Sequence, residues 1–128
     1  MRGVWAHPLM DRIVCWNVRG MNSPHKQEDI RLFLHKQSPG MVSFIETKVL
    51  EENMAQVVGR VCNNWQWAHN ADSMNKGRVL VCWHPQKYHY QVLFQSDQLI
   101  HEKALQLSTN KQFYITFVYG RNLEAQRI

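Results

Sequence analysis

The fold of this chain is decided by the stretch Ile13-Val14-Cys15-Trp16-Asn17-Val18-Arg19-Gly20-Met21-Asn22-Ser23-Pro24. Its first four residues form a short apolar run with polar residues on both sides, which predicts a buried strand starting near residue 11. Ser23 and Pro24 are typical of a helix N-terminus, because serine caps free backbone N–H groups and proline fits the first helical position. The stretch therefore predicts a strand, a polar loop and a helix in direct succession.

A second strand and helix follow. Ile30, Phe33 and Leu34 place one apolar stripe on the first helix, and Ser38-Pro39-Gly40 ends it. Residues 41–45 form another apolar run and predict a second buried strand. From residue 50 to residue 61, apolar side chains recur at the spacing of an amphipathic helix. The first half of the chain therefore predicts strand, helix, strand, helix.

The second half predicts strands only. Trp65 and Trp67 alternate with polar or small residues, as in a short strand. Four further strands are expected over residues 78–83, 88–94, 99–107 and 112–119, separated by short turn-like segments. This order predicts an α+β fold, that is, a layered α/β arrangement. Because no repeat or linker divides the chain, we expect one domain over residues 11–128, preceded by an extension of unknown role over residues 1–10.

Composition narrows the class of protein. The 128 residues carry a net charge of +5, which favours polyanionic partners only modestly because the basic residues are scattered. Cys15, Cys62 and Cys82 show no C-x-x-C spacing, so a reducing compartment is expected rather than a disulfide framework. No apolar run approaches the length of a membrane span or a secretory signal. We therefore expect an intracellular protein with no membrane partner, in the nucleus or the cytoplasm.

Three polar residues follow the ends of predicted strands: Asn17, Glu46 and Tyr119. Strand ends often gather functional groups, since exposed loops begin there from a fixed sheet. A carboxylate after a buried strand suits Mg²⁺, which prefers oxygen ligands. From the pattern alone, Glu46 can instead pair with Lys48 or cap the next helix, and Asn17 can serve a turn.

Two other groups of side chains are weaker candidates for a functional site. His84, His89 and Cys82 lack a recognised zinc spacing. Trp65 and Trp67 can stack on bases, but alternating aromatic residues on a strand are usually part of a core. We expect neither group to form the functional site.

Four segments resemble the endonuclease/exonuclease/phosphatase superfamily, in particular the apurinic-endonuclease-like domain of plant LINE-type (non-LTR) retrotransposons. They are the stretch 13–24, Phe44-Ile45-Glu46-Thr47-Lys48, Lys76-Gly77-Arg78-Val79-Leu80-Val81 and Phe117-Val118-Tyr119-Gly120. They occur in family order over residues 11–127. The resemblance implies half of a four-layer α/β-sandwich, a mixed sheet with two helices on one face, as the N-terminal portion of a truncated domain over residues 11–128.

The resemblance also implies an activity and a role for each site residue. The activity is Mg²⁺-dependent hydrolysis of DNA phosphodiesters. Glu46 would bind Mg²⁺, Asn17 would help to hold the metal site, and Tyr119 would direct its hydroxyl at a phosphate oxygen. Nucleic-acid contacts are expected from Arg19, Asn22, Lys48, Lys76 and Arg78. Since Arg19 stands where the apurinic-site nucleases carry an Asp, the resemblance supplies no second acidic ligand at that position.

Two catalytic motifs of the family are missing. No Asp-x-Asn, which positions the attacking water, occurs in the chain. Ser96-Asp97-Gln98 has Gln where the family has its catalytic His, and it precedes Tyr119, so it is interpreted as a turn; His101 is interpreted as a strand residue. We expect the isolated chain to be inactive as an enzyme. The alternatives are a non-catalytic remnant that binds nucleic acid or protein, or another branch of the superfamily, such as a phosphoinositide phosphatase or deadenylase.

A half domain also predicts an uncovered surface. Phe113, Ile115, Phe117 and Tyr119 alternate onto one side of their strand, where the second sheet of the sandwich would pack. If the chain supplies only one sheet, this inner face is exposed and apolar. We therefore expect poor solubility or self-association through that sheet face.

Overall fold

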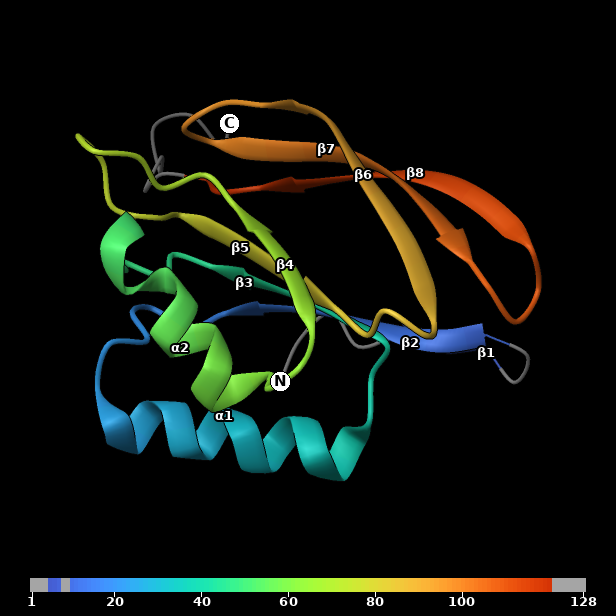
Figure 1. Cartoon of the computed structure of the whole chain (residues 1–128), viewed down its shortest axis with the longest axis horizontal. Helices are drawn as coiled ribbons and strands as arrows, with labels where there is room; N and C mark the ends of the chain where they lie inside the picture. Colours follow the sequence, from blue (N-terminus) through green and yellow to red (C-terminus); the bar gives the residue numbers. More distant parts are fainter. Residues whose placement is uncertain (1–4, 8–9, 121–128) are drawn as a thin grey trace, which may run out of the picture.

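The computed structural model describes residues 5–7 and 10–120. These residues form two α-helices, a single 3-10 turn and eight strands (Figure 1). In chain order the elements are β1 (Trp5–His7), β2 (Met10–Asn17), α1 (Pro24–Gln37), β3 (Met41–Ile45), the 3-10 turn (Glu51–Asn53), α2 (Met54–Val61), β4 (Gln66–His69), β5 (Val79–Trp83), β6 (Tyr88–Gln95), β7 (Leu99–Gln106) and β8 (Lys111–Val118).

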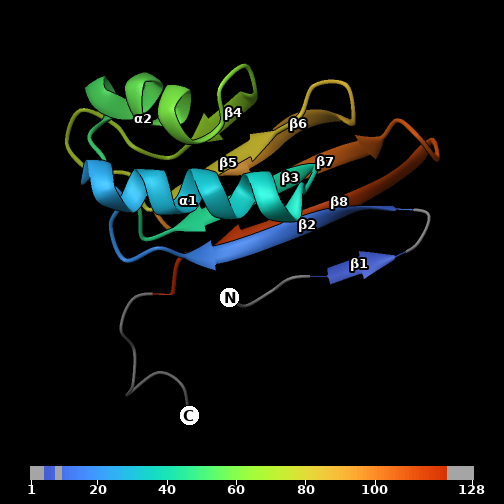
Figure 2. The same cartoon turned by 90° about the horizontal axis from the view of Figure 1, so that it is seen from below.

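The elements lie in three layers. Sheet A has the strand order β1-β2-β3-β5-β4, in which only β2 and β3 are parallel, and sheet B has the antiparallel order β6-β7-β8. Helices α1 and α2 cover one face of sheet A, and sheet B packs on the other (Figure 2). The predicted layered α/β fold, with a mixed sheet and two helices on one face, is confirmed. Within the described part of the chain, no helix is long and apolar enough to cross a membrane.

Local sequence explains where the elements begin and end. The Ser23 hydroxyl accepts a hydrogen bond from the Lys26 N–H (3.1 Å) at the start of α1, and Ser38 closes the helix in a left-handed conformation. Every residue of β3 and β5 is buried, as expected for central strands packed on both faces. The strand–loop–helix succession predicted from the stretch 13–24 is thus confirmed.

Two elements differ from the sequence-based expectation. The second helix begins at Met54 rather than near residue 50, because the 3-10 turn precedes it and leaves Leu50 41% exposed. Residues 1–10 were expected to form an extension, but Trp5–His7 pair with the edge of β2, and Met10 belongs to β2 itself. Pairing at an edge uses backbone groups and needs no side-chain pattern, which explains why the sequence does not reveal it. Residues 1–4, 8–9 and 121–128 lie outside the described part of the chain.

The expectation that the chain supplies only one sheet is wrong. Strands β6–β8 fold back over sheet A, so that Ile100, Ala104 and Phe117 pack between the sheets together with Met41 and Val81. The inner face is therefore covered within the chain. On sheet B, exposed apolar side chains lie instead on the outer face, where Tyr114 and Val118 are 61% and 54% exposed.

The cysteines belong to the core rather than to a disulfide. Cys15, Cys62 and Cys82 are free thiols. Burial raises the pKa of Cys15 and, more strongly, the pKa of Cys82, which disfavours their thiolate forms. The expected absence of a disulfide framework holds for these three residues.

Candidate functional site

The three strand-end residues predicted from the sequence lie at the same end of the molecule. We call this end the rim; it consists of the segments after β2, β3 and β8, residues 70–78 and the β6–β7 turn (Figure 1, left). Because β2 and β3 are parallel with Asn17 opposite Ile45, Asn17 and Glu46 leave sheet A on adjacent strands. Tyr119 follows β8, and its backbone N–H donates to the Gln98 carbonyl (2.7 Å).

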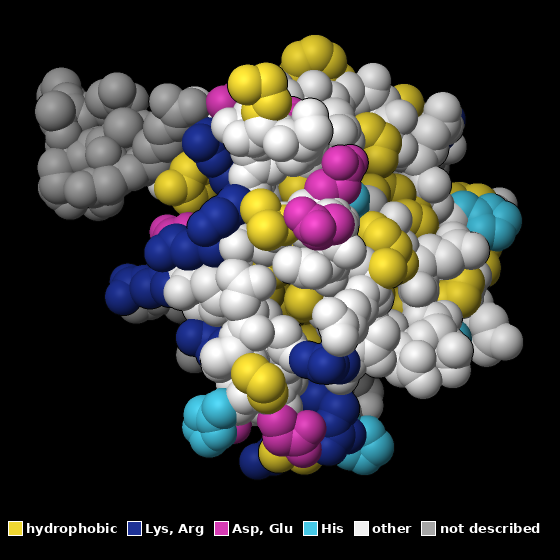
Figure 3. All heavy atoms as spheres, turned by 60° about the vertical axis from the view of Figure 1, so that its left-hand side comes forward, with side chains coloured by type: hydrophobic (Ala, Val, Ile, Leu, Met, Phe, Trp, Pro, Cys, Tyr) yellow, Lys and Arg dark blue, Asp and Glu magenta, His cyan; other side chains and the backbone are white. Residues whose placement is uncertain are grey.

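A pocket of about 240 Å³ opens at the rim. Its lining consists of Glu46, Lys48, Met74, Asn75, Lys76, Gly77, Arg78 and Tyr119. The Arg78 guanidinium lies over the Tyr119 ring, 5.3 Å from the ring centroid, in a cation–π contact that joins the two sheets. Lys and Arg side chains gather along one side of this end of the molecule (Figure 3). The pocket thus combines three cations, one carboxylate and one phenol.

Three residues in the loops at the rim have an unfavourable backbone conformation. Arg19, Glu46 and Lys48 have φ of +51°, +63° and +59°, in the left-handed region that non-glycine residues rarely adopt. Two hydrogen bonds stabilise this backbone conformation. The Gly20 N–H donates to the Glu46 carbonyl (2.7 Å), and the Glu46 N–H donates to the Arg78 carbonyl (2.6 Å). Such strain persists only where the surroundings fix it, and it is typical of functional sites.

Thr47 and Gly77 tie two of these loops into one unit. The buried Thr47 hydroxyl donates to the Gly77 carbonyl (2.7 Å), which also accepts from the Lys48 N–H (2.9 Å). A Cβ atom at Gly77 would lie 2.8 Å from Met54 Cε and 3.0 Å from Thr47 Oγ1, so a larger residue here would force these side chains to shift. The conformation of Glu46 and Lys48 therefore depends on the glycine-bearing turn that precedes β5.

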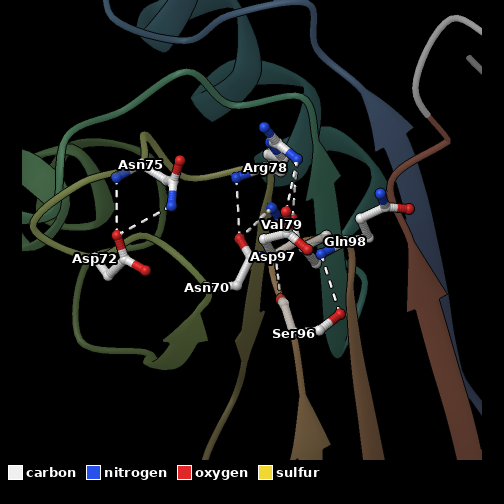
Figure 4. A network of polar contacts seen from close by, with 8 residues as sticks. All are labelled: Asn70, Asp72, Asn75, Arg78, Val79, Ser96, Asp97 and Gln98. Atoms are coloured by element: carbon white, nitrogen blue, oxygen red, sulfur yellow. Dashed lines mark hydrogen bonds and ion pairs between the residues drawn. The ribbon is translucent and has the colours of Figure 1, made fainter.

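Asn70 connects the pocket to sheet B, and the sequence analysis missed it. Its Oδ1 accepts from the backbone N–H groups of Arg78 (3.0 Å) and Val79 (2.9 Å), and its Nδ2 donates to the Ser96 carbonyl (3.1 Å) (Figure 4). The side chain is 6% exposed. An Asn in a polar loop has no distinguishing signal in a single sequence, so only the fold reveals this role.

The triplet at residues 96–98 is a turn, as predicted. The Gln98 N–H donates to the Ser96 hydroxyl (3.2 Å), and the Asp97 carboxylate accepts from Arg78 Nη1 at 3.4 Å (Figure 4). Asp97 thereby holds Arg78 at the rim by an ion pair. His101 lies in β7, where its Nδ1 is 2.7 Å from the Thr116 hydroxyl, so its interpretation as a strand residue is confirmed.

The structure also shows the purely structural roles that the sequence pattern allowed for the predicted site residues. Glu46 Oε2 lies 3.7 Å from Lys48 Nζ, and Asn17 Oδ1 accepts from the Arg19 N–H (3.1 Å) in a turn. Asn22 Nδ2 donates to the Lys48 carbonyl (2.8 Å) and so ties the two loops together. Asn17, Arg19 and Asn22 are exposed at the rim but are not among the residues that line the pocket.

The pocket lining offers a divalent metal ion a single carboxylate, so water and a substrate phosphate would have to supply the other ligands. Among the described residues, no group of three or more His, Cys, Asp or Glu side chains could hold a metal ion. Glu46 supplies the only carboxylate in the described lining, beside three cations. Mg²⁺ is commonly held by one or two carboxylates, with water and substrate phosphate completing its shell. Phosphate oxygens would also offset the positive charge of Lys48, Lys76 and Arg78.

The weaker candidates do not form a site among the described residues. Trp65 and Trp67 pack against the core beneath α1 and α2, as the sequence favoured. Cys82 is fully buried in that core, and with His84 and His89 it forms no metal cluster.

Comparison with known proteins identifies the fold. No family model matches the chain, and no curated protein matches it. Among solved structures, the AP endonuclease LMAP from Leishmania major superposes with a TM-score of 0.64 at 13% identity, over 90% of this chain and 43% of that one. The catalytic domain of human Nocturnin, solved with a bound sulfate anion, gives 0.53 at 10% identity, over 79% of this chain and 47% of that one.

These likenesses agree with the resemblance seen in the sequence, at the level of fold. The chain spans less than half the length of either protein. Its three layers, with two helices on sheet A and sheet B opposite, correspond to a partial α/β sandwich. The chain therefore has the fold of the AP endonuclease from Leishmania major and of the catalytic domain of human Nocturnin, over the part that it shares with them.

Proposed function

We propose that this chain is the N-terminal portion of a Mg²⁺-dependent DNA endonuclease domain of retrotransposon type, and that the isolated chain binds the DNA backbone without cleaving it. The observation that carries the proposal is the rim pocket, which gathers Glu46, Tyr119 and three cations from segments far apart in the sequence. The nuclease-like fold of two solved structures supports the same class.

The residues of the pocket are suited to a phosphodiester. Arg78 offers a planar fork of N–H donors for two phosphate oxygens, and its ion pair with Asp97 and contact with Tyr119 fix its position. Lys48 and Lys76 add positive charge beside it. The Tyr119 hydroxyl would donate to a phosphate oxygen from the sheet B side. Together these groups bind and orient a phosphate rather than break it.

Glu46 and Asn17 are the residues that would hold Mg²⁺. They come from adjacent strand ends, and Glu46 would exchange its ion pair with Lys48 for the metal when phosphate occupies the pocket. When bound, the metal neutralises charge on the phosphodiester. Cleavage also needs a group that activates the attacking water, and the sequence contains no Asp-x-Asn to supply one.

A non-catalytic DNA-binding remnant is the second candidate function. The Glu46–Lys48 ion pair favours this second candidate, because in the free protein it engages the Glu46 carboxylate that would otherwise bind the metal. Both candidates share the same DNA-binding surface, and Mg²⁺ distinguishes them: it strengthens DNA binding through Glu46 only if the metal site is retained.

The salt dependence of DNA binding tests the shared surface. We expect the affinity for a labelled duplex, measured by fluorescence anisotropy, to fall with salt, because each phosphate contact contributes about 0.9 to the slope of log K against log salt. Lys76→Ala and Arg78→Ala should each lower this slope by about 0.9. Lys36→Ala, an equal charge change in the last turn of α1, is the control and should leave the slope unchanged. An equal loss in all three variants would contradict a localised site.

Cleavage is tested separately. Plasmid DNA incubated with the chain and Mg²⁺ should remain supercoiled, because loss of a general base alone costs about 10²–10⁴-fold in rate. Nicking that is abolished by Glu46→Gln would show that the isolated chain is an active nuclease, and would contradict the proposal that it only binds.

A further inference from the structure

The four sheet edges of the described structure differ in how well they resist pairing. In sheet A, β1 has three residues with an irregular register, and β4 has four residues. In sheet B, the β6 edge has a bulge between Val92 and Phe94. β8 has eight residues, a regular register, no proline and a single charge, at Lys111. Short strands, bulges and charged side chains usually protect a sheet edge from pairing with another strand. Of the four edges, β8 has the fewest of these features.

The direction of the free backbone groups on β8 follows from the ladder with β7. In an antiparallel pair, residues alternate between those bonded to the neighbour and those whose N–H and C=O point away. Leu99 is opposite Val118 in this ladder, so Gln98 is opposite Tyr119, and the Tyr119 N–H donates to the Gln98 carbonyl. Tyr119 and every second residue before it therefore bond to β7. The outward backbone groups are those of Gln112, Tyr114, Thr116 and Val118.

We propose that β8 pairs antiparallel with β8 of a second copy, about a two-fold axis at Ile115, to form one continuous sheet. In this register Tyr114 lies opposite Thr116 of the second copy, and Gln112 opposite Val118, so all four outward residues are paired. A two-fold axis at Tyr114 would leave Val118 unpaired. A shift by one residue would place inner side chains opposite outer ones. The pairing does not depend on the proposed function.

The chemistry of β8 favours a second copy as the partner. In the proposed register, Phe113 meets Phe117 and Ile115 meets its own copy, which extends the apolar inner layer across the axis. Lys111, the single charge, lies opposite Tyr119, so no like charges face each other. The same strand therefore supplies matching length, pattern and charge on both sides, as an isologous interface requires. The register also brings Lys111 of the second copy beside the rim.

A pair of matched double variants tests both the pairing and its register. Gln112 and Val118 are exposed on the outer face of sheet B, so changing them leaves the core intact. Gln112→Lys/Val118→Lys would place like charges opposite each other twice across the axis, whereas Gln112→Lys/Val118→Glu would place opposite charges there. In sedimentation velocity at low salt, the parent chain should form a concentration-dependent dimer. The first variant should raise the dimer dissociation constant about tenfold, and the second should restore or tighten it.

Each outcome is decisive. If the parent chain stays monomeric at all accessible concentrations, the proposal is wrong. This holds whether the β8 edge is unpaired or is covered by another segment of the same chain. Aggregates larger than a dimer, or equal responses of the two double variants, would also overturn it. Thermal melting followed by circular dichroism checks that both variants fold as the parent does. A dimer that weakens only in the like-charge variant would establish β8 and this register.

Discussion

Glu102 carries an ionisable group into the layer between the two sheets. The residue is fully buried on β7, and neither carboxyl oxygen has a hydrogen-bond partner among the described residues. Burial raises its pKa to about 8, which the neighbouring Tyr90 hydroxyl opposes without reaching a normal hydrogen-bond geometry. The carboxyl is therefore largely protonated at neutral pH, and an apolar layer holds the sheets together around it.

We predict that Glu102→Gln changes how stability depends on pH. The pKa is raised from an ordinary 4.5 to about 8 on folding, so the folded state binds more protons between these values. In the parent, the free energy of unfolding should fall by up to about 1.4 kcal/mol per pH unit as pH rises through this window. Glu102→Gln should remove that slope and be more stable than the parent at pH 8. The slope of the unfolding free energy against pH is measured for both proteins by urea denaturation at several pH values.

An exposed glutamate provides the control for this measurement. Glu28 is paired with Arg31 on the surface of α1, and its pKa is lowered mainly by that hydrogen bond. Glu28→Gln should leave the decline of stability between pH 5 and 8 unchanged, because an exposed pair contributes little. A parent chain whose stability is flat over this window would show that Glu102 does not titrate as described.

At the scale of elements, the turn before β5 sets the geometry of the rim. Gly77 and Arg78 bond to residues 46–49 through backbone groups and the Thr47 hydroxyl, while the methyl end of Met54 in α2 lies against Gly77. The site loops are thus packed against the helix layer. A change at Gly77 should disturb stability and phosphate binding together.

We predict that Gly77→Ala destabilises the fold by about 1–3 kcal/mol through overpacking. The new Cβ would meet Met54 Cε at 2.8 Å and Thr47 Oγ1 at 3.0 Å, and the Thr47 hydroxyl is fixed by its bond to the Gly77 carbonyl. Gly59→Ala is the matched control, since nothing lies within 4 Å of a Cβ there and the residue is within α2. It should stabilise by about 0.5–1 kcal/mol. Equal effects of the two changes in urea denaturation would refute the steric account.

Sequence patterns predicted those elements whose residues face a core. The central strands β3 and β5 and the stripe of α1 were evident because continuous or periodic burial leaves a pattern. Three features were not evident from the sequence: the pairing of Trp5–His7, the 3-10 turn before Met54 and the role of Asn70. Backbone pairing, the start of a helix and a single amide side chain leave no periodic pattern of residues. Glu46 and Tyr119 were predicted from strand ends and from resemblance, whereas their shared pocket required the fold.

For the whole molecule, three layers place the rim at the meeting point of both sheets. Glu46 follows sheet A, Tyr119 follows sheet B, and Arg78 connects them through its contacts with Tyr119 and Asp97. The covered inner face explains how a chain that spans less than half of its structural neighbours still has two packed hydrophobic clusters. We expect association at the exposed apolar residues on the outer face of sheet B and at the β8 edge, with which no second described strand is paired.

Paramagnetic relaxation can locate the phosphate and metal site that we propose at the rim. We predict that Mn²⁺, added with a short DNA duplex to ¹⁵N-labelled chain, broadens the backbone amide signals of residues 46–48, 76–78 and 119, and that Glu46→Gln abolishes this. Signals from the last turn of α1 and from residues 84–87, at the opposite end of sheet A, should stay sharp. Broadening centred on that opposite end, or spread evenly over the molecule, would show that the rim does not hold the metal.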